Sequence, residues 1–288
     1  MRNASPLRYP GGKWRFADYF HRLISTNFQA PPLYFEPYSG GASLALSLLF
    51  RGVVSKIYLN DLDRAVYSFW RAVLDDTDEL IELIESTPIT PTEWKKQHAV
   101  YSQDSRSGRL RRAFAFFFLN RTNHSGILNA GMIGGKQQSG RWKLDARYNR
   151  EELIRRIRMI RTLKSRIHVS REDGIDFARR QAEHAQPSIM YVDPPYFRAG
   201  QRLYMNFYGP SEHIALRDTV TKLPCAWVVS YDDVPEIRQL YSGIKSRRFA
   251  LLHTARSARV GKEVMFFAPG LKVPRSHDPI CSIVTKTR

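Results

Sequence analysis

Residues 34–43 read YFEPYSGGAS and connect an apolar strand to a helix rich in leucine and alanine. Glycines in such a loop let the backbone approach a ligand closely, and the start of the helix offers free amide groups. About 25 residues after Glu36, the next apolar run ends at Asp61. A carboxylate there accepts hydrogen bonds from ribose hydroxyls in nucleotide-binding α/β folds. The glycine loop alone also fits a plain tight turn. The loop and Asp61 together predict a ligand site at the carboxyl ends of parallel strands.

Short β-type runs recur along the chain, each followed by a helix-like segment, which is typical of a sheet with crossover helices. The expected strands are residues 33–36, 56–60, 166–170, 189–193, 226–230 and 264–268. Between them lie the expected helices 62–74, 78–85 and 109–119, a glycine-rich basic loop, 120–150, and an amphipathic helix, 151–164, that we expect to pack on the sheet. We therefore expect an α/β fold: a mostly parallel, Rossmann-like sheet from residues 1–61 and 151–288, with an inserted, mostly helical domain at 62–150.

The chain is strongly basic, with 45 Lys and Arg against 27 Asp and Glu and a net charge of +18. Such a surface attracts polyanions. The charge is spread along the chain rather than gathered in one amphipathic helix, which favours nucleic acid over a membrane or a merely basic protein. The two cysteines lack metal-type spacing, so we expect no metal. Without an apolar leader or an apolar run of about 18 residues, we expect a cytoplasmic protein.

Residues 191–196 read YVDPPY and follow directly on an apolar strand. Two prolines cannot donate backbone hydrogen bonds, so the chain presents carbonyl groups and the Asp193 carboxylate. An amine on an aromatic base is a poor nucleophile because its lone pair is delocalised into the ring. Hydrogen bonds from its two protons to Asp193 and to the Pro194 carbonyl would direct the lone pair at a sulfonium methyl group. Tyr196 would stack on the base; the alternative is a proline-rich turn with a chance aspartate.

At these residues the sequence resembles the Dam-type family of adenine-N6 DNA methyltransferases, in the family's alpha arrangement, over nearly the whole chain. Residues 8–13, RYPGGK, are similar to a family segment whose aromatic residue and lysine bind S-adenosyl-L-methionine (AdoMet). The resemblance implies a set of cofactor-binding residues: Tyr9, Lys13, Glu36, Pro37, Ser39, Gly40, Gly41, Asp61 and Asp193. The catalytic residues that it implies are Asp193, Pro194, Pro195 and Tyr196.

The stretch FLNR at 118–121, with Asn123 and Gly126, is similar to the Leu-Asn-Arg stretch of the family's target-recognition region. After it, residues 129–136 read NAGMIGGK where the Dam branch usually shows GEFNVPFG. We therefore expect a recognition site other than GATC.

Two basic elements are candidates for contact with DNA. The loop 120–150 contributes Arg121, Asn123, Lys136, Arg141 and Lys143, with Trp142 and Tyr148 interleaved. Arginine commonly reads bases and aromatic side chains stack near a flipped base, although a solvated loop with phosphate contacts only is the alternative. Residues 253–262 join two apolar strands as a hairpin. We expect the charged hairpin residues Arg256, Arg259 and Lys262 to contact phosphates without reading the DNA sequence.

Taken together, the residues and the resemblance imply methyl transfer from AdoMet to N6 of adenine in double-stranded DNA, with the base flipped out of the helix. A cytosine-N4 methyltransferase is an alternative, because it also methylates an exocyclic amine. Such enzymes more often carry Ser in place of Asp193. A non-catalytic DNA-binding protein and an enzyme acting on RNA or on protein amides are weaker alternatives. The recognition sequence, the choice between monomer and homodimer, and a restriction–modification, phage or solitary origin stay open.

Overall fold

A computed structural model describes residues 4–9, 13–103, 108–197, 208–253 and 259–275. For residues 250–253 and 259–260 it describes the backbone alone. The chain divides into two compact units. The sheet unit comprises Met1–Asn3, Lys13–Leu62 and Arg166–Arg288, and the helical unit comprises Ala4–Gly12 and Asp63–Ser165. The helical unit thus takes in residues 4–12 and 151–165, which we had expected in the sheet unit. Hydrogen bonds explain this grouping, since Arg156 donates to the Ser5 carbonyl and the Arg8 amide donates to Asn120.

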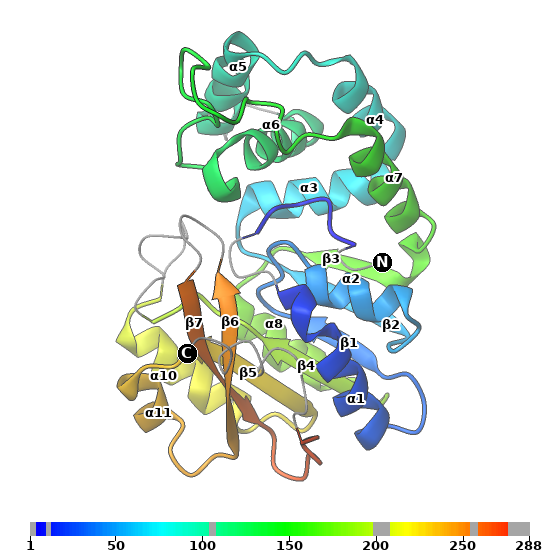
Figure 1. Cartoon of the computed structure of the whole chain (residues 1–288). Helices are drawn as coiled ribbons and strands as arrows, with labels where there is room; N and C mark the ends of the chain where they lie inside the picture. The colour runs from blue at the N-terminus through cyan, green and yellow to red at the C-terminus, as the bar shows by residue number, and fades with distance from the viewer. Residues whose placement is uncertain (1–3, 10–12, 104–107, 198–207, 254–258, 276–288) are drawn as a thin grey trace. The chain divides into compact units, whose positions relative to one another are not determined.

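The sheet unit is built on a seven-stranded sheet in the order β3-β2-β1-β4-β5-β7-β6 (Figure 1). The strands are β1 (Leu33–Glu36), β2 (Lys56–Asn60), β3 (Ile167–Ser170), β4 (Ser188–Val192), β5 (Ala226–Asp232), β6 (Ser246–His253) and β7 (Arg259–Phe267). The first five are mutually parallel, and β7 lies antiparallel between β5 and β6. All residues of β1 and β4 are buried, as expected for strands covered on both faces.

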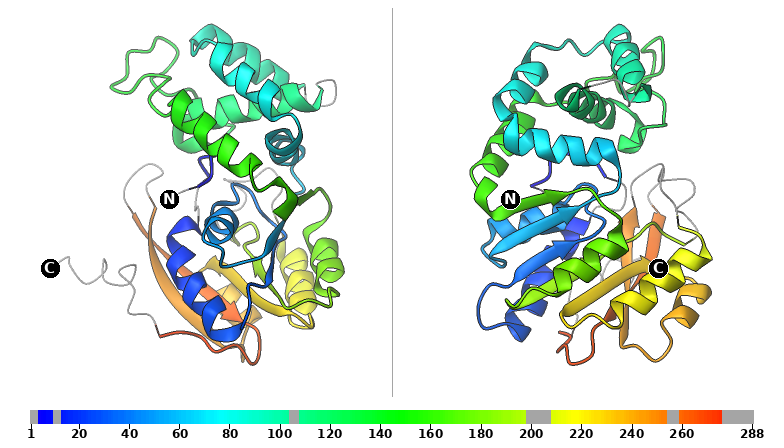
Figure 2. Two further views of the ribbon diagram at one scale, coloured as in Figure 1. Left: turned by 90° about the vertical axis from the view of Figure 1, so that its right-hand side faces the viewer. Right: turned by 180° about the vertical axis from the view of Figure 1, so that it is seen from behind.

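Helices cover both faces of this sheet (Figure 2). They are η1 (Lys13–Phe16), α1 (Ala17–Asn27), α2 (Ser43–Phe50), α8 (Gly174–Ala182), α10 (Pro210–Val220) and α11 (Pro235–Leu240), while η3 (Lys164–Arg166) lies at the boundary of the two units. The crossover through α2 runs from β1 outward to β2, whereas the crossovers through α8 and α10 run in the opposite direction across the sheet. Because such connections are right-handed, α2 lies on one face and α8 and α10 on the other. The parallel strand ends therefore meet at one edge of the sheet, where ligands of such folds bind.

The β6–β7 pair forms the expected hairpin, but both arms are longer than the apolar runs suggest. The strand expected at 264–268 begins at Arg259, and His253 pairs with Arg259. Ladder hydrogen bonds to β5 and β6 set the length of β7, and a sequence pattern does not reveal them.

The helical unit contains α3 (Arg64–Asp75), α4 (Thr77–Ser86), α5 (Pro91–Ser102), α6 (Arg109–Thr122), η2 (His124–Gly126) and α7 (Arg150–Arg161). Helix α6 is its centre, because all four phenylalanines at 114 and 116–118 are buried. The Phe117 ring stacks on Phe69 of α3, with 5.7 Å between the ring centroids. Asp63 caps α3 by accepting hydrogen bonds from the amides of Ala65 and Val66.

Helix α7 corrects one sequence-based expectation. Its apolar residues Leu153, Ile157 and Ile160 are buried, as the helical spacing predicts. The helix packs on α3 and α4 within the helical unit, however, and the expectation that it packs on the sheet was wrong. Periodicity shows which face of a helix is buried but not which partner covers that face.

Candidate active site

The glycine loop after β1 adopts backbone conformations that the sequence requires of it. Gly40 has φ of 44° and Ala42 has φ of 46°, and both therefore lie in the left-handed region. Glycine reaches this region at little cost, whereas Ala42 stores strain there, which is typical of functional turns. Helix α2 then begins at Ser43. The loop residues Ser39, Gly40 and Gly41 are buried, and Pro37 lies buried before them.

Asp61 lies against this loop, as predicted. Its Oδ2 atom accepts a hydrogen bond of 2.8 Å from the amide of Gly40, 21 residues away. The structure therefore brings the loop and the acidic residue together at neighbouring strand ends.

Asn60, which the sequence analysis did not single out, ties three strand ends together. It is fully buried, and its side-chain amide donates to the carbonyls of Pro37 and Glu172 at 3.0 Å each. Its Oδ1 atom accepts from the Ser170 hydroxyl and the Glu172 amide. A polar residue immediately before a strand-end acid was the signal that could have pointed to it.

Glu36 is buried at the end of β1, with 5% of its surface exposed. Burial raises the pKa of this carboxyl group to about 8, and the charge of Asp193 adds to the rise. A hydrogen bond of 2.8 Å from the Tyr34 hydroxyl to Oε1 opposes the rise. Glu36 is therefore mostly protonated at neutral pH.

Asp193 follows β4 and forms an ion pair with Lys13 of η1. The Lys13 Nζ atom lies 2.9 Å from Oδ1 and 2.7 Å from Oδ2 of Asp193. It also donates to the Tyr196 hydroxyl at 2.8 Å, and it lies 5.1 Å from the centre of the Tyr196 ring. Lys13 is 5% exposed, whereas the Asp193 side chain keeps 23% of its surface exposed, so the lysine is shielded from water and the carboxylate stays accessible. The structure thus joins the lysine of the RYPGGK segment to the predicted catalytic motif, 180 residues later.

Two further residues of this cluster were not predicted. The Ser230 hydroxyl of β5 donates to Asp193 Oδ1 at 2.6 Å, and the Tyr191 hydroxyl lies 2.7 Å from Ser230 Oγ. Glu263 of β7 is 1% exposed, accepts a hydrogen bond from the Tyr196 hydroxyl, and lies 3.7 Å from Lys13 Nζ. Both residues sit in apolar strands, where a lone serine or glutamate among buried neighbours was the available signal.

The remaining predicted cofactor and catalytic residues lie as follows. Pro194 is buried and Pro195 is half-buried, directly after Asp193. Tyr9 is half-buried and belongs to the helical unit.

In the helical unit, Asn123 and Asn120 order the start of the predicted recognition loop. Asn123 is fully buried, accepts from the Trp94 indole at 2.6 Å, and donates to the carbonyls of Ile127 and Leu128. Asn120 exchanges hydrogen bonds with the backbone of Arg8. A side chain as buried as Asn123 holds the loop rather than meeting a base.

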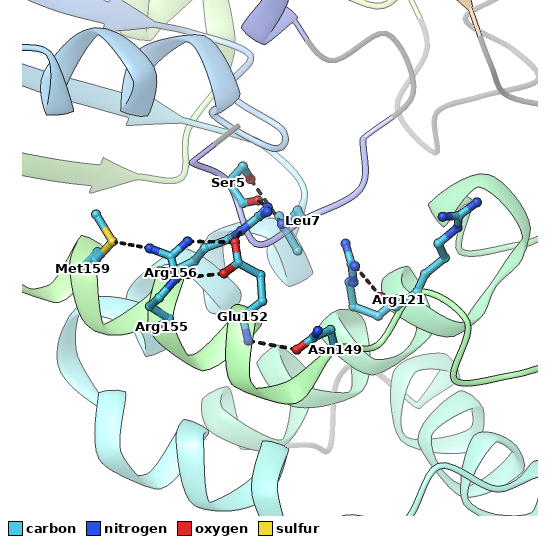
Figure 3. Close-up of polar contacts among 9 residues, drawn as sticks. Ser5, Leu7, Arg121, Asn149, Glu152, Arg155, Arg156 and Met159 are labelled. Carbon is cyan, nitrogen blue, oxygen red and sulfur yellow. Dashed lines mark hydrogen bonds and ion pairs between the residues drawn. The ribbon is translucent and has the colours of Figure 1, made fainter. Parts of the chain in front are cut away.

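Arg121 points inward, among other arginines (Figure 3). Its guanidinium group donates to the carbonyl of Arg147. Burial lowers the pKa of Arg121, and the nearby charges of Arg8 and Arg156 add to this effect. Together they bring the pKa to about 9. Figure 3 also shows Glu152 between Arg155 and Arg156, so that one carboxylate serves both. This placement favours ordering of the loop over base readout by Arg121.

The other basic side chains of the loop face solvent. Lys136, Arg141 and Lys143 are exposed, and Lys143 donates to the Gln138 carbonyl. Trp142 is 57% exposed, and the guanidinium groups of Arg141 and Arg147 lie 5.3 Å and 5.8 Å from its ring centre. The loop therefore presents an indole flanked by cations, a combination that binds nucleic acid by stacking and charge.

Of the three charged hairpin residues, the structure describes one side chain. Lys262 is exposed on β7. Arg256 and the side chain of Arg259 lie outside the described residues.

Within the described ranges, no group of three or more His, Cys, Asp or Glu side chains is arranged to hold a metal ion. The helices of that part of the chain include none long and apolar enough to cross a membrane.

The sequence matches the D12 class N6 adenine-specific DNA methyltransferase family over residues 9–256, and the chain belongs to that family. The type II methyltransferase M.MjaIII of Methanocaldococcus jannaschii is 22% identical over an alignment of 203 residues, which covers 66% of this chain and 68% of the relative. The type II methyltransferase M1.LlaDCHI of Lactococcus lactis subsp. cremoris is 23% identical over 275 residues, 88% of this chain and 91% of the relative. An rRNA methyltransferase of Streptomyces viridochromogenes has a TM-score of 0.40 at 13% identity, with 88% of this chain and 83% of that chain covered.

Family membership confirms the activity and the cofactor inferred from the YVDPPY motif and the glycine loop. The protein is an AdoMet-dependent adenine-N6 DNA methyltransferase with a Rossmann-like α/β sheet.

Proposed function

We propose that the enzyme methylates an adenine flipped out of double-stranded DNA, and that Asp193 and the Pro194 carbonyl accept the two protons of its N6 amine. The position of Asp193 supports this assignment: it follows the buried strand β4, and Lys13 and Ser230 hold its carboxylate in place. The hydrogen bond from Ser230 orients the carboxylate before the amine arrives. Tyr196, two residues past Pro194, stacks on the base.

The charges of the sheet unit fit AdoMet, which carries a sulfonium and an ammonium group against one carboxylate. Glu36, Asp193 and Glu263 are three carboxyl groups gathered around the single amine of Lys13. A cationic ligand beside them would lower the pKa of Glu36 and so favour its charged form. Glu36 and Asp193 would hold the methionine part, and Asp61 with the loop amides the ribose. When bound, AdoMet supplies the electrophilic methyl group.

The chain's own residues orient the amine and take up its charge. Asp193 accepts one amine proton and the Pro194 carbonyl the other, which directs the nitrogen lone pair away from both acceptors. As the nitrogen becomes positive during transfer, the Asp193 carboxylate stabilises that charge.

Incubation of the protein with tritium-labelled AdoMet and mixed-sequence duplex DNA tests this function. Digestion to nucleosides should place the label in N6-methyladenine. Label in N4-methylcytosine, or in an RNA supplied in parallel, would contradict the proposal.

Replacement of Asp61 by alanine should weaken AdoMet binding by about ten- to a hundredfold, because a charged hydrogen bond contributes roughly 1.5–3 kcal/mol. Asp61 also holds the Gly40 amide, so the variant loosens the loop as well. Isothermal calorimetry measures the affinity. The matched control is Asp18→Ala, an exposed aspartate of α1 that should bind AdoMet normally. Unchanged affinity in Asp61→Ala would remove Asp61 from the ribose site.

The exposed basic residues should divide into two kinds of DNA contact. Lys262→Ala should weaken binding to all duplexes alike and reduce the salt slope by about one. Arg141→Ala or Lys143→Ala should relax the choice of site if either reads a base, since a good base contact is worth roughly ten- to a hundredfold in discrimination. Duplex binding at several salt concentrations measures the first effect, and methylation of a substrate library, sequenced for modified positions, measures the second, with Lys222→Ala as the control. If every loop variant keeps the wild-type motif, recognition lies elsewhere, and helices α4 to α6 are the next candidates.

A further inference from the structure

The ion pair between Lys13 and Asp193 conflicts with the chemistry that Asp193 performs. Lys13 Nζ contacts both oxygens of Asp193, at 2.9 Å and 2.7 Å. The Ser230 hydroxyl also donates to Oδ1, so these three contacts fill most of the acceptor positions that the adenine amine needs, and the lysine charge weakens the position that is left. An ammonium group that is 5% exposed cannot simply lose its anion, because a buried charge without a partner is strongly destabilising. Lys13 therefore needs a second anion close by.

Glu263 is placed to be that anion. Its Oε1 atom lies 3.7 Å from Lys13 Nζ, so a small rotation of the lysine side chain would close the gap. Its Oε2 atom is buried and accepts no hydrogen bond from any residue that the structure describes. A buried acceptor without a donor is costly unless a donor reaches it in another state of the protein. The Tyr196 hydroxyl bridges the two groups, since it accepts from Lys13 and donates to Glu263.

We propose that Glu263 is a positioning residue that takes up Lys13 when the Asp193 carboxylate engages the adenine amine. The inference rests on the proposed function, because it presumes that Asp193 binds the amine. Glu263 touches neither substrate nor cofactor in this scheme; it acts by moving the lysine away from the catalytic carboxylate.

The surrounding charges are consistent with this exchange. Lys13, Asp193 and Tyr196 face Glu263, Tyr191 interacts with it through space, and Asp232 is its register partner on β5. Burial raises the pKa of Glu263 to about 7, and the Asp193 charge adds to the rise while Lys13 opposes it. Glu36, whose pKa burial raises to about 8, is mostly neutral at pH 7 in the ligand-free protein. Below pH 7, protonation of Glu263 should leave Lys13 on Asp193 and slow the reaction.

Glu263→Gln is the informative variant, because glutamine keeps the shape and can still accept the hydrogen bond from Tyr196. The substitution removes the charge and replaces one acceptor oxygen with an NH2 group. We expect kcat to fall by about ten- to a hundredfold, with KM for AdoMet within about twofold of the wild type. The wild-type kcat should rise with pH through about 7, and this rise should be absent from Glu263→Gln. Glu236→Gln, an exposed glutamate of α11, is the matched control and should behave as the wild type.

A second readout requires neither cofactor nor DNA. Urea unfolding of the ligand-free wild type, Asp193→Asn, Glu263→Gln and the double variant forms a double-mutant cycle. Each single variant leaves Lys13 one of the two anions, whereas the double variant removes both. We therefore expect the double variant to lose more stability than the sum of the two single losses.

The outcomes separate the two hypotheses. A wild type that forms no N6-methyladenine overturns the proposed function. An active wild type that Glu263→Gln matches in kcat and in pH profile overturns the role of Glu263 alone, as does an additive unfolding cycle. Tyr196→Phe tests the remaining alternative: if it reproduces the loss of the pH-dependent rise, Glu263 acts only through the Tyr196 hydroxyl, and the exchange of Lys13 is wrong.

Discussion

Replacement of Asp193 by alanine is expected to reduce methyl transfer by about a hundredfold or more while leaving the protein folded. The substitution removes the carboxylate that, in the proposed mechanism, accepts the amine proton and stabilises the charge that develops on nitrogen. The folded state should survive because Lys13 keeps Glu263 as an anion 3.7 Å away. Single-turnover transfer of labelled methyl groups measures the effect, and circular dichroism checks the fold.

Asp193→Asn and Asp176→Ala sharpen this experiment. Asparagine keeps an acceptor oxygen without the charge, so its rate should lie between those of the wild type and the alanine variant. Asp176 is an exposed aspartate of α8, and its loss should leave the rate unchanged. If Asp193→Ala retains more than about a tenth of the wild-type rate, Asp193 is not the amine acceptor.

The second large effect concerns the stability of the protein against pH. Glu36 has a folded-state pKa of about 8 against an ordinary value of 4.5, because burial disfavours its charged form. A carboxyl group with a raised folded-state pKa favours folding fully below pH 4.5, and this contribution is lost as the pH rises towards 8. Each pKa unit corresponds to about 1.4 kcal/mol, so the loss approaches on the order of 3–5 kcal/mol at pH 9.

Glu36→Gln should abolish this dependence, since glutamine keeps the acceptor for the Tyr34 hydroxyl but cannot ionise. Urea unfolding at pH 5, 7 and 9 measures the free energy of unfolding of both proteins. In the difference between the two, the contributions of groups that do not interact with Glu36 cancel. The variant should become progressively more stable than the wild type as the pH rises. Glu236→Gln should instead track the wild type at every pH. Parallel curves for Glu36→Gln and the wild type would show that Glu36 ionises freely in the folded protein.

Several elements could be predicted from local patterns almost to the residue. Strands β1 and β2 lie where the apolar runs end at turn-forming residues, and α6 begins at the expected Arg109. Asp61 lies against the glycine loop because parallel strands place their carboxyl ends at one edge. These features depend on residues close in sequence, or on a rule of topology that holds for the whole class of fold.

Other features could not be predicted because their causes are not local. Helix α7 shows an apolar face in the sequence, but its partners, α3 and α4, are set by tertiary packing. Asn123 is a typical polar loop residue by sequence, and only the surrounding Trp94 and backbone carbonyls make it a buried organiser of the loop.

The two parts of the site illustrate the same division. The motif YVDPPY predicts the acceptor chemistry, because the type and spacing of Asp193 and its prolines suit that chemistry within a few residues. The surroundings of Asp193 depend on the fold: Lys13 lies 180 residues before it, Ser230 37 residues after it, and Glu263 enters on an antiparallel strand. Burial then raises the pKa of Glu36 and Glu263, and burial is a property of the packed protein and not of any segment of its sequence.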